Sequence, residues 1–286
     1  MREGYFGPTA SLDRSGAYEQ NASPFISTIK TDMAHWDKAY KENENMAHTE
    51  RSLKLRQLED EWKTIPKEQV EEWSIEGEQV VADINKVGND KYGFWVREVG
   101  LVDATEIVAR ALKKADPSAK LIITEDHLMD EWFANEQPTL RRHFFAFLDE
   151  LQKRNVPLDG VGIENNAWIH NPPSMEFMQQ ILNEIKKRDL YIANSETDVL
   201  MTEEYPWYER VKKTGEVAPE IIHRDIAEAY IQAGAKGIGF GNAEDKWSFW
   251  QYSNIDGQDS LFDKNGQPKP AFYEVLKVIY KYAIVQ

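Results

Sequence analysis

The sequence predicts an α/β fold, a TIM-type (β/α)8 barrel formed by a single domain over residues 1–286. Three observations predict this fold. From Trp73 onward, short apolar runs alternate with longer segments of helical periodicity, which is the pattern of βα units around a parallel sheet. Carboxylate or amide side chains follow successive apolar runs, as they do at the carboxyl ends of barrel strands. The chain length also suits a barrel, which commonly takes about 250 residues as one domain.

The expected strands are short apolar runs. Two weak candidates precede Trp73, at residues 4–10 and 24–29. The later strands are expected at residues 73–78, 121–124, 160–163, 190–193 and 237–240. Residues 37–72 are mostly charged and helical in pattern, so they offer no third strand. The barrel is therefore expected to be incomplete or irregular around its third strand.

The expected helices alternate with these strands. They are placed at residues 102–115, 140–154, 175–188, 221–233 and 271–282. The first is stopped by Asp116-Pro117, because proline disfavours a helical conformation in the residue before it. Gly234 is suited to end the fourth helix in the left-handed conformation that glycine adopts easily.

Polar side chains end each expected strand after residue 72. They are Glu76 and Glu78, Glu125 and Asp126, Glu164 to Asn166, Glu196 and Asp198, and Asn242. In a closed barrel the carboxyl ends of the strands converge on one face, where active sites lie. Polar residues can also simply end a strand, but their recurrence predicts a shared acidic cleft.

Composition and charge narrow the function further. The formal net charge of −15 disfavours nucleic acid and acidic polymers, and it favours a neutral or cationic ligand or simply a solvated acidic surface. The absence of cysteine excludes disulfides and thiolate chemistry. The six histidines form no i,i+4 pair and no HExxH motif, so no metal site is expected. Without a phosphate loop or dinucleotide motif, no cofactor is expected either.

Membrane and targeting signals are also absent from the sequence. No apolar run approaches the roughly 18 residues that a membrane-spanning helix needs. The first residues, MREGYFGPTASL, lack the apolar core of a signal peptide. We therefore expect no membrane association, and a cytoplasmic protein unless a signal peptide has been removed. The sequence leaves the oligomeric state open.

Four stretches carry a resemblance to a known family. They are FWVREVG at 94–100, ADPSAKL at 115–121, VPLDGVG at 156–162 and SLFDKNGQPKPAFY at 260–273. In this order they make residues 73–286 similar to glycoside hydrolase family 10, the retaining endo-1,4-β-xylanases, whereas residues 1–72 diverge. The resemblance implies a (β/α)8 barrel that acts on a β-linked oligosaccharide or polysaccharide such as xylan.

The resemblance extends to two catalytic motifs. Asn194-Ser-Glu-Thr-Asp-Val199 is similar to the family's I-T-E-x-D-(V/I), which implies that Glu196 is the nucleophile. Trp73-Ser-Ile-Glu-Gly-Glu78 is similar to W-x-(V/I)-x-N-E, which implies that Glu78 is the acid/base. A retaining glycosidase needs such a carboxyl pair about 5–5.5 Å apart. The residues implied to bind substrate are Trp36, Glu164, Asn166, Asp198, Phe240 and Trp250.

Several positions of the family's sugar-binding shell are changed in this chain. Gly77 stands where the family has Asn, Glu164-Asn-Asn166 stands for Q-x-H, and Phe240 stands for Trp. Two hypotheses follow. The chain is a retaining glycosidase of xylan or another plant polysaccharide, or it is a catalytically weak or inactive relative that binds carbohydrate or a protein partner. A different barrel chemistry, with Glu164 or Asp126 as an additional acid, is a third reading.

Overall fold

The computed structural model describes residues 4–6, 72–75, 100–130, 137–202, 213–248 and 258–283. The described residues divide into two compact units. One contains those up to Ile122 together with 149–158, and the other contains 123–148 and those from 159 onward. Among the sequence predictions, the strand at 24–29 and the residues Trp36, Glu78 and Trp250 lie outside the described residues. Residues 37–71, in which the sequence offers no third strand, lie outside them too.

The first unit contains the start of the sheet. Strand β1 (Gly4–Phe6) runs parallel to β2 (Glu72–Ile75), and Gly4 pairs with Trp73. Strand β3 (Lys120–Glu125) follows β2 in the sheet and ends in the second unit. Helix α6 (Leu101–Ala115) buries one face that is rich in alanine, and the Arg154 guanidinium forms ion pairs with Asp103 and Glu106 of this helix.

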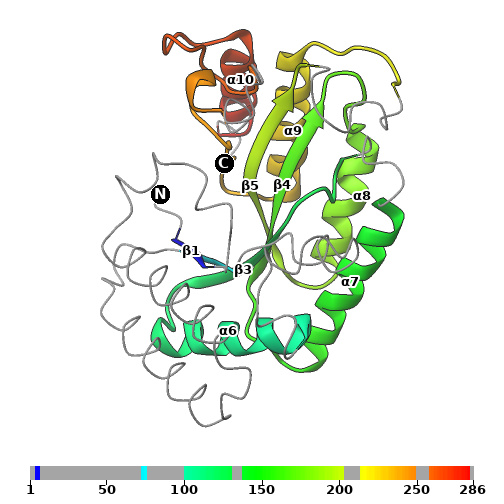
Figure 1. The fold of residues 1–286 in the computed structure, drawn as a ribbon, viewed down its shortest axis with the longest axis vertical. Helices are drawn as coiled ribbons and strands as arrows, with labels where there is room; N and C mark the ends of the chain where they lie inside the picture. The colour runs from blue at the N-terminus through cyan, green and yellow to red at the C-terminus, as the bar shows by residue number, and fades with distance from the viewer. Residues whose placement is uncertain are drawn as a thin grey trace, which may run out of the picture. The chain divides into compact units, whose positions relative to one another are not determined.

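The second unit carries two long parallel strands, β4 (Gly160–Trp168) and β5 (Tyr191–Leu200). In the sheet, β4 lies between β3 and β5. This unit contains α8 (Met175–Lys186), α9 (Pro219–Ala233), α10 (Pro270–Ala283), a short 3-10 helix η3 (Asp245–Trp247) and the part of α7 (Gln137–Lys153) before residue 149. Helices α8 and α9 pack against β5 and run alongside β4 and β5 (Figure 1). Among the described helices, none combines the length and apolar character needed to cross a bilayer.

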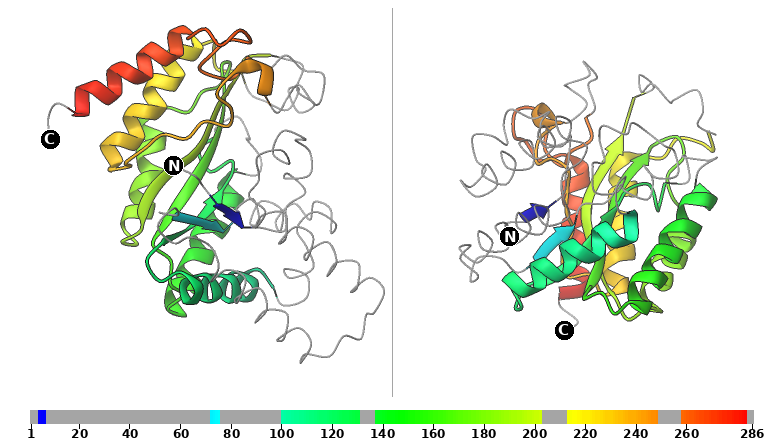
Figure 2. Two further views of the ribbon diagram at one scale, coloured as in Figure 1. Left: turned by 90° about the vertical axis from the view of Figure 1, so that its left-hand side faces the viewer. Right: turned by 60° about the horizontal axis from the view of Figure 1, so that its bottom comes forward.

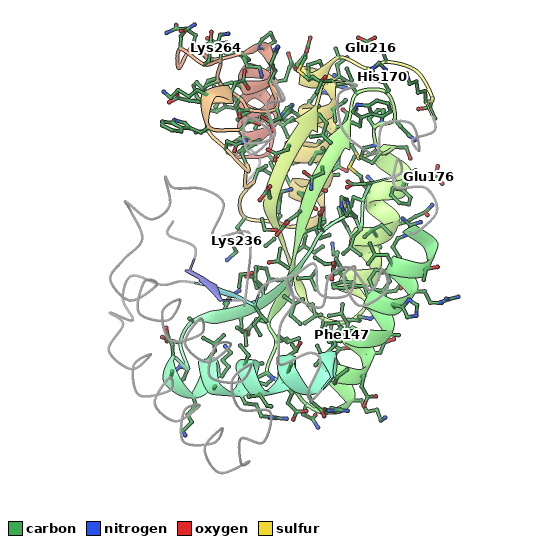
Figure 3. The ribbon with its side chains drawn as sticks, in the orientation of Figure 1. Phe147, His170, Glu176, Glu216, Lys236 and Lys264 are labelled. Carbon is green, nitrogen blue, oxygen red and sulfur yellow. The ribbon has the colours of Figure 1, made fainter. Side chains whose placement is uncertain are left out.

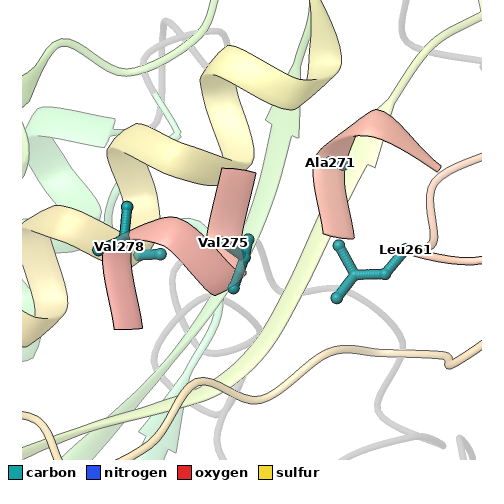
Figure 4. Packing of buried hydrophobic residues seen from close by; sticks show 5 residues of the cluster. Leu261, Ala271, Val275 and Val278 are labelled. Carbon is teal, nitrogen blue, oxygen red and sulfur yellow. The ribbon is translucent and has the colours of Figure 1, made fainter. Parts of the chain in front are cut away.

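Helix α10 is held against α9 by a small apolar cluster. Figure 2 shows the two helices side by side, and they make extensive contact. One face of α10 carries Ala271, Val275 and Val278 at helical spacing. They are buried together with Ala227 of α9 and with Leu261, which precedes α10 (Figure 4). Phe240 also packs against this cluster. The cluster therefore helps to hold the neighbouring residues Gly239 and Gly241, which lie close to β5 at Ser195, Glu196 and Asp198.

An irregularity in the pairing of β4 with β5 decides which side chains share a face. Ile163 pairs with Asn194, but the next residue, Glu164, pairs with Glu196, so Ser195 is an extra residue in β5. Such a bulge bends a strand and re-aims the side chains after it. Because side chains alternate along a strand, the register places Glu164, Asn166, Glu196 and Asp198 on one face of the sheet. We call this set of four the carboxylate face.

The structure confirms the predicted helices of the described part and changes the strands. The runs 160–163 and 190–193 are correct starts, but the strands continue to Trp168 and Leu200, so the polar residues lie within them. The strand predicted at 237–240 is wrong, because it contributes only an isolated bridge between Asn194 and Ile238. Glycines on both sides of Ile238 weaken strand formation, since they offer no side chain to pack.

Candidate active site

Four of the predicted site residues lie together. Glu164 and Asn166 on β4 stand opposite Glu196 and Asp198 on β5. Adjacent strands are about 4.8 Å apart, so paired residues on one face are direct neighbours. Asp198 is buried, whereas Glu196 is only partly buried and remains open to a ligand. The predicted partner of Glu196, Glu78, lies outside the described residues.

The opposite face of β4 and β5 is covered by α9. Asn165, which alternates with the carboxylate face, donates from Nδ2 to the Tyr230 hydroxyl at 3.1 Å. The same amide donates to the backbone carbonyl of Glu196 at 3.2 Å. Asn165 and Tyr230 are both almost completely buried. The carboxylate face therefore points away from α9, and the Glu196 backbone is anchored to that helix through Asn165.

The glycine segment, residues 239–241, overlaps the end of the predicted last strand and lies against the bulge. Gly239 N donates to the backbone oxygen of Asn194 at 3.0 Å and to its Oδ1 at 2.9 Å. A Cβ atom built on Gly241 would lie 2.6 Å and 2.7 Å from the two carboxyl oxygens of Asp198 and 2.8 Å from Glu196 Oε1. Only glycine leaves room for both carboxyl groups at this point. Sequence reasoning missed Gly241, although glycines at 237, 239 and 241 signalled a close approach.

The carboxylate face has a strongly acidic environment. Burial raises the pKa of Asp198 well above its usual value, and the charge of Glu196 raises it further. The carboxyl groups of Asp259 and Asp126 act in the same direction. Asp259 precedes α10 and accepts a hydrogen bond from the Ser248 hydroxyl at 2.9 Å. The site thus gathers carboxyl groups from the segment after β3, from β5 and from the segment before α10.

Asp126 extends the site beyond β3. It accepts a hydrogen bond from Asn166 Nδ2 at 2.9 Å, which links it to the carboxylate face. Burial raises the pKa of Asp126, and the adjacent His127 opposes that effect. Asp126, His127 and Asp130 offer potential metal ligands within 4.8 Å of one another. However, the two ring nitrogens of His127 already contact Asp130 at 2.7 Å and Asp126 at 3.0 Å, so the group is a hydrogen-bonded triad.

Phe240 is placed differently from the other predicted site residues. Its ring stacks on His223 of α9 with centroids 6.2 Å apart. It also packs against the apolar cluster between α9 and α10. This packing accounts for a bulky apolar residue between Gly239 and Gly241, and a contact of Phe240 with sugar stays a prediction.

The connection after β5 returns to the ends of the long strands. Thr214 N donates to the His170 carbonyl at 2.9 Å, and Val217 N donates to the Ile169 carbonyl at 2.9 Å. His170 and Glu216 accordingly lie at the end toward which β4 and β5 point (Figure 3). In a barrel this carboxyl end carries the substrate-binding loops.

Comparison with protein families gives one match over most of the chain. Residues 33–278 match glycosyl hydrolase family 10. The chain is 26% identical over 241 residues to a thermostable celloxylanase of Thermoclostridium stercorarium, covering 79% of this chain and 58% of that protein. It is 23% identical over 212 residues to a β-1,4-xylanase of Dictyoglomus thermophilum, covering 68% and 56%. The chain thus spans little more than half the length of these relatives.

Solved structures show the fold. Native xylanase 10B of Thermotoga maritima superimposes with a TM-score of 0.60 at 23% identity, covering 82% of this chain and 69% of that one. A thermostable mutant xylanase of Cellvibrio japonicus gives a TM-score of 0.62 at 20% identity, covering 78% and 70%. These likenesses confirm the (β/α)8 barrel predicted from the sequence, of which the described strands form a part.

Proposed function

Because the chain belongs to glycosyl hydrolase family 10, we propose that it is a retaining glycoside hydrolase that cleaves β-1,4-xylan or a related plant polysaccharide. The observation that carries the proposal is the position of Glu196. It occupies the family's nucleophile motif, and its side chain lies on the carboxylate face beside Asp198. The relatives described above are a celloxylanase and a β-1,4-xylanase, which supports a β-linked substrate.

The reaction proceeds by double displacement. Glu196 attacks the anomeric carbon and forms a covalent glycosyl-enzyme, while Glu78 protonates the departing glycosidic oxygen. Glu78 then removes a proton from water, which attacks the same carbon and releases Glu196 as a carboxylate. The two displacements together retain the configuration of the anomeric carbon. The scheme needs neither metal nor organic cofactor.

The local structure suits Glu196 to this role. Its backbone carbonyl is fixed by Asn165, and the bulge at Ser195 turns its side chain toward the carboxylate face. A nucleophile held by rigid elements reacts faster, because the geometry of attack is prepared before the substrate binds. Its partial exposure leaves a path for the sugar, whereas Asp198 beside it is buried.

The test replaces Glu196 and assays reducing-sugar release from a panel of β-glycans that includes xylan. The wild type should hydrolyse at least one glycan, and Glu196→Gln should lose at least about a thousandfold in rate. Glu176→Gln is the matched control, because Glu176 is an exposed residue of α8, on the side of that helix turned away from the strands (Figure 3). Equal inertness of the wild type and Glu196→Gln across the panel contradicts the proposal.

The alternative is a catalytically weak or inactive carbohydrate-binding protein. The replacement of the family's Asn by Gly77 and of its His by Asn166 favours it, because both positions contribute to sugar binding or to the nucleophile in the resemblance. Calorimetry with xylo-oligosaccharides separates the two functions. Tight binding without turnover favours the alternative, and rapid turnover of the same oligosaccharides eliminates it.

A further inference from the structure

The carboxyl groups of Glu196 and Asp198 meet in the space left by Gly241. The absent Cβ of Gly241 would collide with oxygens of both groups. Their carboxyl oxygens therefore converge on the same small space. An ionised carboxylate can only accept hydrogen bonds, so a bond between two carboxyl groups needs a proton on one of them. Two carboxyl groups that converge in this way, one of them buried, therefore suit a pair that shares one proton.

Burial decides which group carries that proton. Asp198 is 2% exposed, and its Oδ1 has no hydrogen-bond partner within the described part of the chain. A buried oxygen without a donor is far less costly in a neutral acid than in a carboxylate. Among the residues that the structure describes, the titratable groups with the largest effect on Asp198 are Glu196 beside it on β5, Asp126 after β3 and Asp259 before α10, and all three are acidic. Each of them disfavours a second negative charge at Asp198.

We propose that Asp198 keeps its proton at neutral pH and donates it in a hydrogen bond to the ionised carboxylate of Glu196. Asp198 is then a positioning residue, in place of the substrate-binding role that the family resemblance implies for it. The inference rests on the proposed role of Glu196 as nucleophile. The hydrogen bond holds Glu196 in one orientation and favours its charged form. It also strengthens when the glycosyl-enzyme breaks down and negative charge returns to Glu196.

The direct test is a carbon-13 NMR titration of the full chain labelled at the side-chain carboxyl carbons of Asp and Glu. Asp198→Asn and Glu196→Gln assign the two signals. Near pH 7, where an ordinary Asp is fully ionised, we expect the Asp198 carbon to have the shift of a neutral acid and the Glu196 carbon that of a carboxylate. In Glu196→Gln the midpoint of Asp198 should fall, because a neighbouring charge is removed.

Two NMR results overturn the inference. One is an ionised Asp198 near pH 7, and the other is a midpoint of Asp198 that does not change in Glu196→Gln. If the Asp198 variants fail to fold, the second result is stated for all aspartates: the inference is overturned if no Asp signal that is neutral near pH 7 has a lower midpoint in Glu196→Gln.

Kinetics give an independent readout on the most readily cleaved glycan. Asp198→Asn keeps a hydrogen-bond donor and should retain kcat within about tenfold, whereas Asp198→Ala should lose about a hundredfold. Asp149→Asn on the exposed face of α7 is the matched control. Equal losses in Asp198→Asn and Asp198→Ala contradict the positioning role. An inert wild type with a protonated Asp198 refutes the proposed function alone, and an active wild type with an ionised Asp198 refutes the shared proton alone.

Discussion

Tyr230→Phe removes a single hydroxyl group from the layer between α9 and the sheet. Tyr230 is fully buried, and its hydroxyl exchanges hydrogen bonds with the Asn165 side chain at 3.1 Å and 3.2 Å. Phenylalanine keeps the ring and leaves almost no cavity, so the loss of packing is small. The lost partner leaves polar atoms of Asn165 unsatisfied in a buried place, which costs about 1–3 kcal/mol. We expect the free energy of unfolding to fall by about 2 kcal/mol.

The assay is urea unfolding followed by tryptophan fluorescence and circular dichroism, with the midpoints of wild type and variant compared. Tyr273→Phe is the matched control, because Tyr273 on α10 is 51% exposed and should change stability by less than about 0.5 kcal/mol. Since Asn165 also holds the Glu196 carbonyl, Tyr230→Phe should lower glycan hydrolysis as well. The stabilising role of the hydrogen bonds between Tyr230 and Asn165 is refuted if the midpoint is unchanged in Tyr230→Phe or shifts equally in Tyr273→Phe.

Three further predictions concern the glycine segment and a buried histidine. Gly239→Ala should destabilise the protein by about 3 kcal/mol in urea unfolding, because its Cβ would lie 2.3 Å from the Ser195 backbone oxygen. Gly241→Ala should fold, because its Cβ would meet side-chain oxygens and not backbone atoms. It should lose about a hundredfold in the rate of glycan hydrolysis, because the added methyl group displaces the carboxyl group of Glu196. A folded variant with wild-type activity contradicts this prediction. Burial lowers the pKa of His223 from 6.5 to about 4. His223 therefore takes up a proton at a higher pH in the unfolded chain than in the folded protein. The stabilisation that the neutral imidazole contributes is fully present above pH 6.5 and decreases as the pH falls to about 4. Over that range the wild type should lose about 3 kcal/mol more than His223→Gln, and parallel pH curves contradict the burial of a neutral imidazole.

The helices were predictable because their sequence determinants are local. The helix that ends before Gly234 shows this, since that glycine caps it at a φ of 96° in the left-handed region. The lengths of β4 and β5 were not predictable from apolar runs. Glu164 and Asn166 alternate with buried residues inside β4, so a strand face that carries a site loses its apolar pattern. An apolar run therefore marks only the part of such a strand that lies before the site.

The candidate site was predictable in position and not in detail. Motif similarity pointed to Glu196, and the structure places Glu164, Asn166 and Asp198 beside it on the carboxylate face. The bulge that aligns these residues depends on pairing between two strands, and no local pattern encodes it. The approach of Gly241 is likewise a long-range contact. Periodicity and propensity describe neighbours along the chain, whereas these features arise from neighbours in space.

Glu196 is the proposed nucleophile of a retaining glycosidase. The most direct measurement is mass spectrometry of the protein after reaction with a 2-deoxy-2-fluoro xyloside or xylobioside that carries a good leaving group. Such a reagent accumulates the glycosyl-enzyme, because fluorine slows both its formation and its hydrolysis, whereas the good leaving group speeds only its formation. We predict one added sugar, located on the peptide that contains Glu196, and no addition to Glu196→Gln. Absence of the adduct in a protein that hydrolyses glycans, or its location on another residue such as Glu164, would contradict the claim.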